Sequence, residues 1–253
     1  MNHPRHLPWL ILSGITILTG CAFFVNPAAP GGTGGELRGR VRIIGRRPDP
    51  TLPLALPFRL DRGIFPPPAP IPDERLEISP NGGVRNAVIW IVGEFDVADD
   101  NPPSIVLGIH NSRFVPHVLP APVGGSLRVA NQDKVFHNAN FEAFKSPSYN
   151  RSIESGEKIL LVPRFEAPEC MMIDCRIHPW EHAWIVACQN PHFTVTDLNG
   201  DFRISGIPPG KYPVRIWHPH ARPADEHDGV RMKFEVEIRK GETAVLNVDM
   251  QAR

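Results

Sequence analysis

The sequence has no excess of charge of either sign, since its 253 residues include 27 Lys and Arg and 27 Asp and Glu. A neutral chain has no strong field to attract nucleic acid or an anionic surface, so we expect no nucleic-acid partner. Tyrosine is scarce, with only two residues, and no stretch of 12 residues shows a convincing helical period. A phosphate-binding loop and a Ser-His-Asp set are also missing, which argues against a nucleotide-binding enzyme or a hydrolase.

Glycine and proline, in contrast, are abundant, with 21 and 29 residues. Short alternating apolar segments lie between turn-forming Gly, Pro, Asn and Asp residues, and this pattern predicts β-strands. The predicted strands are 37–44, 87–92, 126–130, 158–162, 184–187, 202–207, 212–217, 233–238 and 244–248. Many short strands at this spacing are typical of β-sandwiches. The sequence therefore predicts an all-β protein.

The N-terminus carries a targeting signal. An apolar run over residues 7–18 follows Arg5, and it is shorter than the about 20 residues that span a bilayer as a helix. This pattern predicts a signal peptide over residues 1–20. The run ends in Leu-Thr-Gly-Cys at residues 18–21, which resembles the lipobox of bacterial lipoproteins.

The lipobox resemblance implies that Cys21 is lipidated and that the lipid anchors the chain to a membrane. It places the protein in the bacterial cell envelope, on the periplasmic side, and Ala22 after the cysteine favours the outer membrane. The alternative is an ordinary signal peptide with an incidental cysteine. In the lipoprotein interpretation, residues 21–35 form the lipidated cysteine and a flexible Gly- and Pro-rich tether.

The remaining chain divides into two predicted units. Residues 36–190 hold the unusual His and Cys residues, and residues 191–253 form a compact four-strand unit. Nine prolines over residues 48–72 exclude a strand there and predict a surface loop. The strand at 37–44 belongs to the first unit in this division, but it could instead pair with the second.

The densest chemical signal is the segment from Cys175 to His182. A thiolate at Cys175 and an imidazole at His178, three residues apart, can converge on one ion if the loop between them turns tightly. His137 can supply a second imidazole from another strand. Two imidazoles and one thiolate define a type 1-like copper site. Zinc competes, because a carboxylate such as Glu181 would complete a tetrahedral set.

Six motifs follow one another along the chain, at residues 83–90, 113–119, 131–133, 175–180, 191–197 and 201–218. In this order they resemble the cupredoxin-like exported proteins often labelled plastocyanin-like or methylamine utilization proteins, together with the carboxypeptidase regulatory-like β-sandwich fused to them. The resemblance covers roughly residues 75–220 and implies a cupredoxin-like Greek-key sandwich followed by a small regulatory-like β-sandwich. It implies a copper protein for one-electron transfer or copper holding, with a redox partner protein. A copper enzyme would need an additional open metal site, which the sequence does not show, so we expect a protein that is not an enzyme.

One position departs from this family pattern. The third residue after the loop histidine is usually the axial Met, whereas here it is Glu181. Either Glu181 caps the copper with a hard oxygen, or His182 does, or the site has drifted. A metal-free structural module that binds a glycan or a protein is the alternative function.

The other cysteines and histidines suggest further roles. If Cys175 and His178 lie at the turn of a hairpin, Cys170 and Cys188 lie at comparable distances along its arms, which predicts a disulfide that leaves Cys175 for the metal. His218 and His220, together with His227, could form a second metal site, although nothing in the sequence fixes its geometry. The remaining histidines outside the N-terminal signal are expected to be structural or exposed: His110, His117, His182 and His192.

Overall fold

The computed structural model describes residues 34–45, 71–95, 104–156, 159–162, 164–224 and 234–253. Every regular element within these ranges is a β-strand, which confirms the all-β prediction. No helix in this part of the chain is long and apolar enough to cross a membrane. The predicted signal peptide, Cys21, the tether and most of the proline-rich loop lie outside the described residues.

Nine strands form a first sandwich, which we call the central sandwich. One sheet has the order β5-β11-β10-β7-β8 and the other β4-β3-β6-β9, and two of the pairs, β5 with β11 and β3 with β6, are parallel. The strands are β3 (Ile105–Ile109), β4 (Phe114–Val115), β5 (Val118–Pro122), β6 (Leu127–Asn131), β7 (His137–Phe141), β8 (Tyr149–Ile153), β9 (Ile159–Val162), β10 (Glu169–Asp174) and β11 (His182–Cys188).

The central sandwich encloses its own apolar core. In β3 and β6 every second residue is buried, as expected for strands that present one face to the opposite sheet. Leu107 and Val129 from these strands pack with Phe141 and Ile173 from the other sheet. The five residues of β7, in contrast, are all buried, so this strand has no solvent-facing side.

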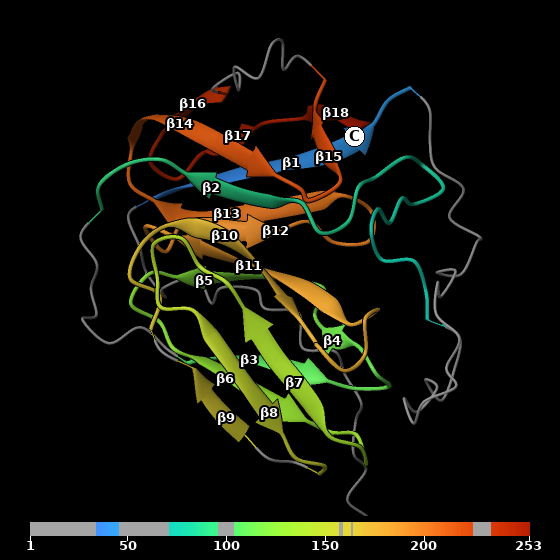
Figure 1. The fold of residues 1–253 in the computed structure, drawn as a ribbon. Coiled ribbons are helices and arrows are strands. Elements are labelled where there is room, and N and C mark those ends of the chain that lie inside the picture. The colour runs from blue at the N-terminus through green and yellow to red at the C-terminus, as the bar shows by residue number, and fades with distance from the viewer. Residues whose placement is uncertain (1–33, 46–70, 96–103, 157–158, 163, 225–233) are drawn as a thin grey trace, which may run out of the picture.

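The second body, the terminal sandwich, is built from both ends of the described chain. Its sheets have the orders β13-β1-β18-β15, with β17 added beside β1, and β12-β2-β14-β16. In Figure 1 the blue strand β1 lies among the orange and red C-terminal strands. The strands are β1 (Gly35–Ile43), β2 (Val88–Ile91), β12 (Phe193–Val195), β13 (Asp201–Ile207), β14 (Gly210–Trp217), β15 (Ala221–Pro223), β16 (Phe234–Ile238), β17 (Thr243–Val245) and β18 (Val248–Ala252).

This pairing differs from the predicted division at residue 190. The strand that the sequence left open, β1, pairs with β13, β17 and β18. The strand β2, which the prediction placed in the first unit, lies between β12 and β14. Leu37 of β1 and Ile89 of β2 are both fully buried in the core of the terminal sandwich. The local sequence identifies such strands, but their partners lie more than 100 residues away, as in the pairing of Ile89 with Ile216.

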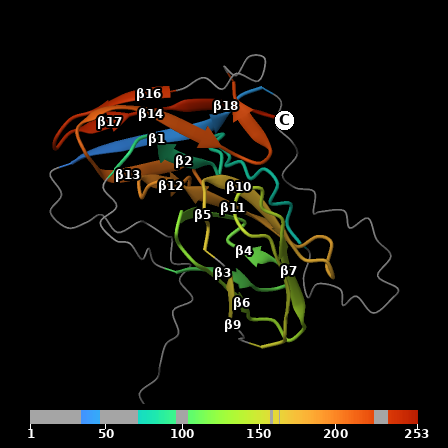
Figure 2. The same cartoon turned by 60° about the vertical axis from the view of Figure 1, so that its left-hand side comes forward.

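The two sandwiches pack against each other through one sheet of each. Val118 and Val186 of the central sandwich contact Val88 and Trp217 of the terminal sandwich in a small apolar cluster. Figures 1 and 2 show strands β5, β10 and β11 facing strands β2 and β12. The molecule is therefore a stack of four sheets, consistent with a cupredoxin-like β-sandwich plus a second β domain.

Candidate metal centre

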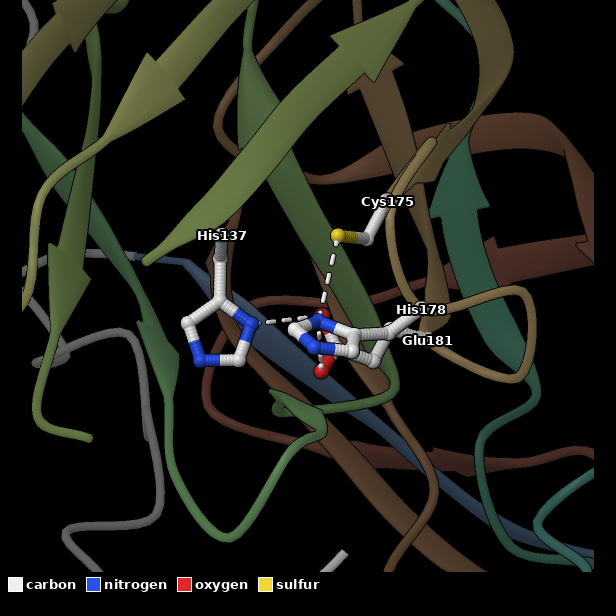
Figure 3. Close-up of side chains that lie close together, drawn as sticks. All are labelled: His137, Cys175, His178 and Glu181. Carbon is white, nitrogen blue, oxygen red and sulfur yellow. Dashed lines mark hydrogen bonds and ion pairs between the residues drawn. The ribbon is translucent and has the colours of Figure 1, made fainter. Parts of the chain in front are cut away.

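Four buried side chains converge at one end of the central sandwich. His137 is the first residue of β7, whereas Cys175, His178 and Glu181 belong to the loop that joins β10 to β11. One ligand atom from each lies within 4.8 Å of all the others. Figure 3 shows the sulfur, the two rings and the carboxylate pointing toward a common centre. The structure thus brings together all four residues that the sequence singled out.

The loop is closed at its base by backbone hydrogen bonds. The β10–β11 ladder ends at the pair Asp174 and His182. Just beyond it, the Cys175 N–H donates to the Glu181 carbonyl at 3.0 Å, and the Glu181 N–H donates to the His178 carbonyl at 2.9 Å. These bonds fold the loop back on itself, so that side chains three positions apart point inward together.

The contacts within the cluster are short. His137 Nδ1 lies 2.9 Å from Glu181 Oε2, and His178 Nδ1 lies 3.1 Å from Glu181 Oε1. Cys175 Sγ lies 3.6 Å from His178 Nδ1. The exposed fractions are 0% for His137, 3% for Cys175, 1% for His178 and 1% for Glu181. The four donors therefore form a buried site, with Glu181 also at the wall of a small pocket.

Burial and charge set the protonation of the cluster. Burial raises the pKa of the Cys175 thiol, and the nearby Glu181 carboxylate raises it further. Burial also acts to raise the pKa of Glu181, but the contacts with His137 and His178 outweigh it and hold that pKa below its usual value. Without a cation, the site therefore holds a neutral thiol beside a carboxylate. A bound cation would reverse the preference of the thiol, because the thiolate is the form that ligates metals.

The donor set fits a single transition-metal ion. Four ligands at ordinary Zn–N, Zn–O and Zn–S distances around a tetrahedral ion are about 3.5 Å from one another. The three contacts of 2.9, 3.1 and 3.6 Å are close to this spacing. A sulfur, two imidazole nitrogens and an oxygen suit copper or zinc rather than magnesium or calcium.

Asp133 lies behind one of the ligands, a contact that the sequence did not predict. Its Oδ2 lies 3.3 Å from His137 Nε2, the ring nitrogen that faces away from the cluster, although Nε2 makes no hydrogen bond there. The same carboxylate accepts the backbone N–H groups of Asn111 and Ser112, both at 2.8 Å. Carboxylate partners of this kind fix the tautomer and the orientation of metal-binding histidines. The Asn-x-Asp motif was visible in the sequence, but only the fold places it behind His137.

Asn138 supports the cysteine in a similar way. Its backbone N–H donates to Cys175 Sγ at 3.3 Å, and its side-chain Nδ2 donates to Asn150 at 2.8 Å. A hydrogen bond to the sulfur lowers the pKa of Cys175, against the effect of burial, and so favours the thiolate. Because Asn138 follows His137 directly, one short segment of β7 positions both a ligand and a donor to a second ligand.

No protein-family model and no curated protein sequence matches this chain. Solved structures that are similar to part of it include the following three. A purple cupredoxin from Nitrosopumilus maritimus is 20% identical over 34% of this chain and 98% of its own, with a TM-score of 0.29. Amicyanin from Paracoccus versutus is 16% identical over 40% of this chain and 97% of its own, with a TM-score of 0.29.

A copper-containing nitrite reductase from Thermus scotoductus SA-01 is 20% identical over 34% of this chain, with a TM-score of 0.31, and the match spans only 22% of the reductase. Scores this low assign no family, so neither the fold class nor the site rests on them.

No disulfide joins Cys170 to Cys188 in the structure, contrary to the prediction. The register explains the error: Cys170 lies opposite Val186, so Cys188 is a diagonal neighbour two residues further along β11. Diagonal positions across a strand pair are about 7–8 Å apart at Cα, beyond the usual span of a disulfide. Hairpin symmetry around Cys175 and His178 was therefore a misleading guide.

The other histidines have separate environments. His182 is not part of the cluster, since its Nδ1 lies 3.2 Å from the Trp180 carbonyl, and Glu181 rather than His182 completes the set. The ring of His192 packs against Phe95, with ring centroids 4.4 Å apart. His110 is exposed. His227 lies outside the described residues.

Proposed function

We propose that His137, Cys175, His178 and Glu181 bind one copper ion, and that the protein transfers single electrons or holds copper. The convergence of one cysteine sulfur and two Nδ1 atoms on a single point carries this proposal. Two imidazoles and a thiolate are the set that holds copper in type 1 sites. When bound, the copper would supply one-electron chemistry.

The closed geometry favours a carrier over an enzyme. Catalytic metal sites keep one coordination position open for water or substrate. Here four buried donors surround the centre, and Glu181 fills the fourth position. The Asp133 and Asn138 contacts hold the His137 and Cys175 side chains in place. A redox partner protein, rather than a small substrate, would then be the functional partner.

We place this activity at the periplasmic face of the bacterial cell envelope, on the basis of the lipobox at residues 18–21. The terminal sandwich would be a regulatory-like module beside the copper domain. Replacing the predicted lipid-bearing residue, Cys21→Ser, is expected to release the protein from membranes or to leave the precursor uncleaved. A mature variant of normal size that still partitions with membranes would contradict the anchor.

The copper proposal is tested by titrating the purified protein with Cu(II) and recording its visible spectrum. We expect one equivalent to produce a strong thiolate-to-copper charge-transfer band. Cys175→Ser should abolish the band, because it removes the sulfur ligand. Cys188→Ser is the matched control: Cys188 is also buried, but it packs between the two sandwiches and should leave the band unchanged.

Zinc is the second candidate, and the position of Glu181 favours it. A carboxylate with one thiolate and two imidazoles completes the tetrahedral set that structural zinc adopts. Stoichiometric binding of zinc without a coloured copper form would replace the copper proposal with a structural zinc site. Failure to bind either ion would favour the metal-free envelope module.

A further inference from the structure

A short turn between β3 and β4 has an unusual backbone conformation. Asn111 and Ser112 are consecutive residues with positive φ, 53° and 55°, in the left-handed region that residues other than glycine seldom occupy. In the described part of the chain, only Asn86 shares this property among the non-glycine residues. Such backbone costs free energy and persists only where surrounding contacts enforce it, which is common beside functional sites.

Asp133 holds this turn from one side. Its two carboxylate oxygens accept the backbone N–H groups of Asn111 and Ser112, each at 2.8 Å. Successive N–H groups in a tight turn form a concave site for an anion, and here the carboxylate fills it. Oδ2 of the same carboxylate lies 3.3 Å from His137 Nε2. The group that holds the turn therefore also contacts a residue of the metal cluster.

Trp180 holds the turn from the other side. Its indole Nε1–H donates to the Ser112 carbonyl at 3.1 Å, and the residue is 6% exposed. Trp180 belongs to the ligand loop, between His178 and Glu181, and its ring centroid lies 5.4 Å from that of His178. The hydrogen bond therefore ties the ligand loop to a segment almost 70 residues earlier in the chain.

The turn at Asn111 and Ser112 thus connects the two segments that carry the cluster. Through Asp133 it contacts the start of β7, and through Trp180 it contacts the loop between β10 and β11. Neither residue of the turn belongs to the cluster, and the Asn111 side chain is exposed. The turn can therefore affect the metal centre only through the placement of its ligands.

Trp184, four residues further along the chain, makes no such connection. It lies in β11 and is half-buried, and its Nε1 has no hydrogen bond although buried indole N–H groups usually find a partner. Its ring packs against Trp217, with ring centroids 5.5 Å apart, at the boundary between the two sandwiches. The two tryptophans therefore differ in whether the indole N–H links the ligand loop to another segment.

We propose that Trp180 is a positioning residue for the metal centre, and that it acts by fixing the ligand loop to the turn at Asn111 and Ser112. This inference rests on the proposed metal binding by the four-residue cluster, but not on which ion is bound. Losing the hydrogen bond should weaken metal binding about threefold to tenfold. A tenfold change corresponds to about 1.4 kcal/mol, which is near the upper end of what one such bond contributes.

The first test replaces each tryptophan in the full chain. Trp180→Phe keeps an aromatic ring beside His178 and removes the N–H donor. Competition titration with Zn(II) should show the weaker binding, and the Cu(II) charge-transfer band should move in wavelength, which a loss of stability alone would not cause. Trp184→Phe is the matched control, and it should leave both the affinity and the band unchanged.

The second test changes the turn without touching Trp180. Asn111→Val places a β-branched residue where φ is positive, a conformation that such residues avoid, and should weaken Zn(II) binding as Trp180→Phe does. Asn111→Gly removes the same side chain but adopts positive φ freely, so it should keep the wild-type affinity. If Trp180→Phe does not fold, this pair tests the same connection.

A measurement on the metal-free protein separates this proposal from metal binding itself. Iodoacetamide labelling, followed at each cysteine by mass spectrometry, reports how often the ligand loop opens, because Cys175 is 3% exposed. Trp180→Phe and Asn111→Val should speed the labelling of Cys175 severalfold, but not that of Cys188, which is also buried.

The outcomes distinguish the two proposals. If the wild type binds neither ion, the proposed function fails, whereas faster labelling of Cys175 in Trp180→Phe would still support the positioning role. That role is overturned if Trp180→Phe labels Cys175 at the wild-type rate, or if it lowers the Zn(II) affinity no more than Trp184→Phe does. Equal losses of affinity in Asn111→Val and Asn111→Gly would contradict the part assigned to the turn.

Discussion

Buried polar groups have different kinds of partner in the two sandwiches. In the terminal sandwich, Thr196 accepts the Ala87 N–H at 2.9 Å and donates to the Val84 carbonyl at 2.7 Å. Asn190 donates to the Ile91 carbonyl at 2.9 Å. In the central sandwich, by contrast, the buried Glu181 carboxylate contacts two other buried ionisable groups, the rings of His137 and His178, at 2.9 and 3.1 Å.

This difference separates structural polar groups from functional ones. A buried polar atom costs stability unless it is paired, so a fold selected only for stability pairs it. Thr196 and Asn190 follow that rule and tie loops to neighbouring strands. The Glu181 carboxylate instead meets two histidine rings, at the point where four ligand atoms converge. Substitutions of comparable residues in the two sandwiches test this difference.

The largest effect is expected at Asp133, through its contact with His137. Asp133→Ala should weaken metal binding about 10–100-fold, the usual cost of losing a carboxylate that orients a ligand. The matched change is Asp197→Ala in the terminal sandwich. Asp197 also accepts two backbone N–H groups, from Asn199 at 2.8 Å and Asp201 at 2.9 Å, but it touches no ligand.

Competition titration of both variants measures the difference, and urea unfolding monitors stability. Each aspartate braces a loop, so both changes should reduce stability, whereas only Asp133→Ala should reduce metal affinity. Equal losses of affinity would mean that the site responds to general destabilisation, and the comparison between the two sandwiches would then fail.

A smaller effect is expected from Glu181→Met, which replaces the oxygen donor with a thioether. A hard anionic oxygen favours Cu(II), whereas the softer sulfur favours Cu(I). The reduction potential should therefore rise, and a rise of about 60 mV would correspond to a tenfold change in the one-electron equilibrium. Protein-film voltammetry measures this shift, and an unchanged potential would show that Glu181 is not a ligand.

The pH dependence of the reduction potential, compared between the wild type and Glu181→Met, gives a second test. In the site without an ion, the contacts with His137 and His178 hold the pKa of Glu181 below its ordinary value of 4.5, although burial alone would raise it. A bound cation would also favour the charged carboxylate and so act in the same direction. The carboxylate should thus stay charged at neutral pH and protonate only in acid. The wild-type potential is expected to be flat near pH 7 and to rise below about pH 4.5, while the variant should lack that rise.

The sequence predicted some of these features better than others, for a physical reason. The Cys175–His178–Glu181 spacing is local, and two backbone hydrogen bonds suffice to turn it inward, so the ligands were predictable. The strand pairing of β1 and β2 depends on contacts with distant segments, and the local alternation of residues does not encode those partners. The same limit applies to the disulfide, which depended on a register shifted by two residues.

The residues that contact the ligands were harder to predict than the ligands themselves. Asp133 and Asn138 stand in recognisable motifs, yet their roles depend on β7 lying beside the loop after β10. His117 gave no sequence signal beyond its residue type. It lines a pocket together with Asp73 and Arg75, which lie more distant in the sequence.

X-ray absorption at the copper edge tests the central claim most directly, because it counts the atoms bound to the ion. The measurement is best made on protein loaded with one equivalent of copper. We predict one sulfur and two imidazole nitrogens, with the sulfur lost in Cys175→Ser and retained in Cys188→Ser. Copper bound only by nitrogen and oxygen in the wild type would contradict a site built from His137, Cys175, His178 and Glu181.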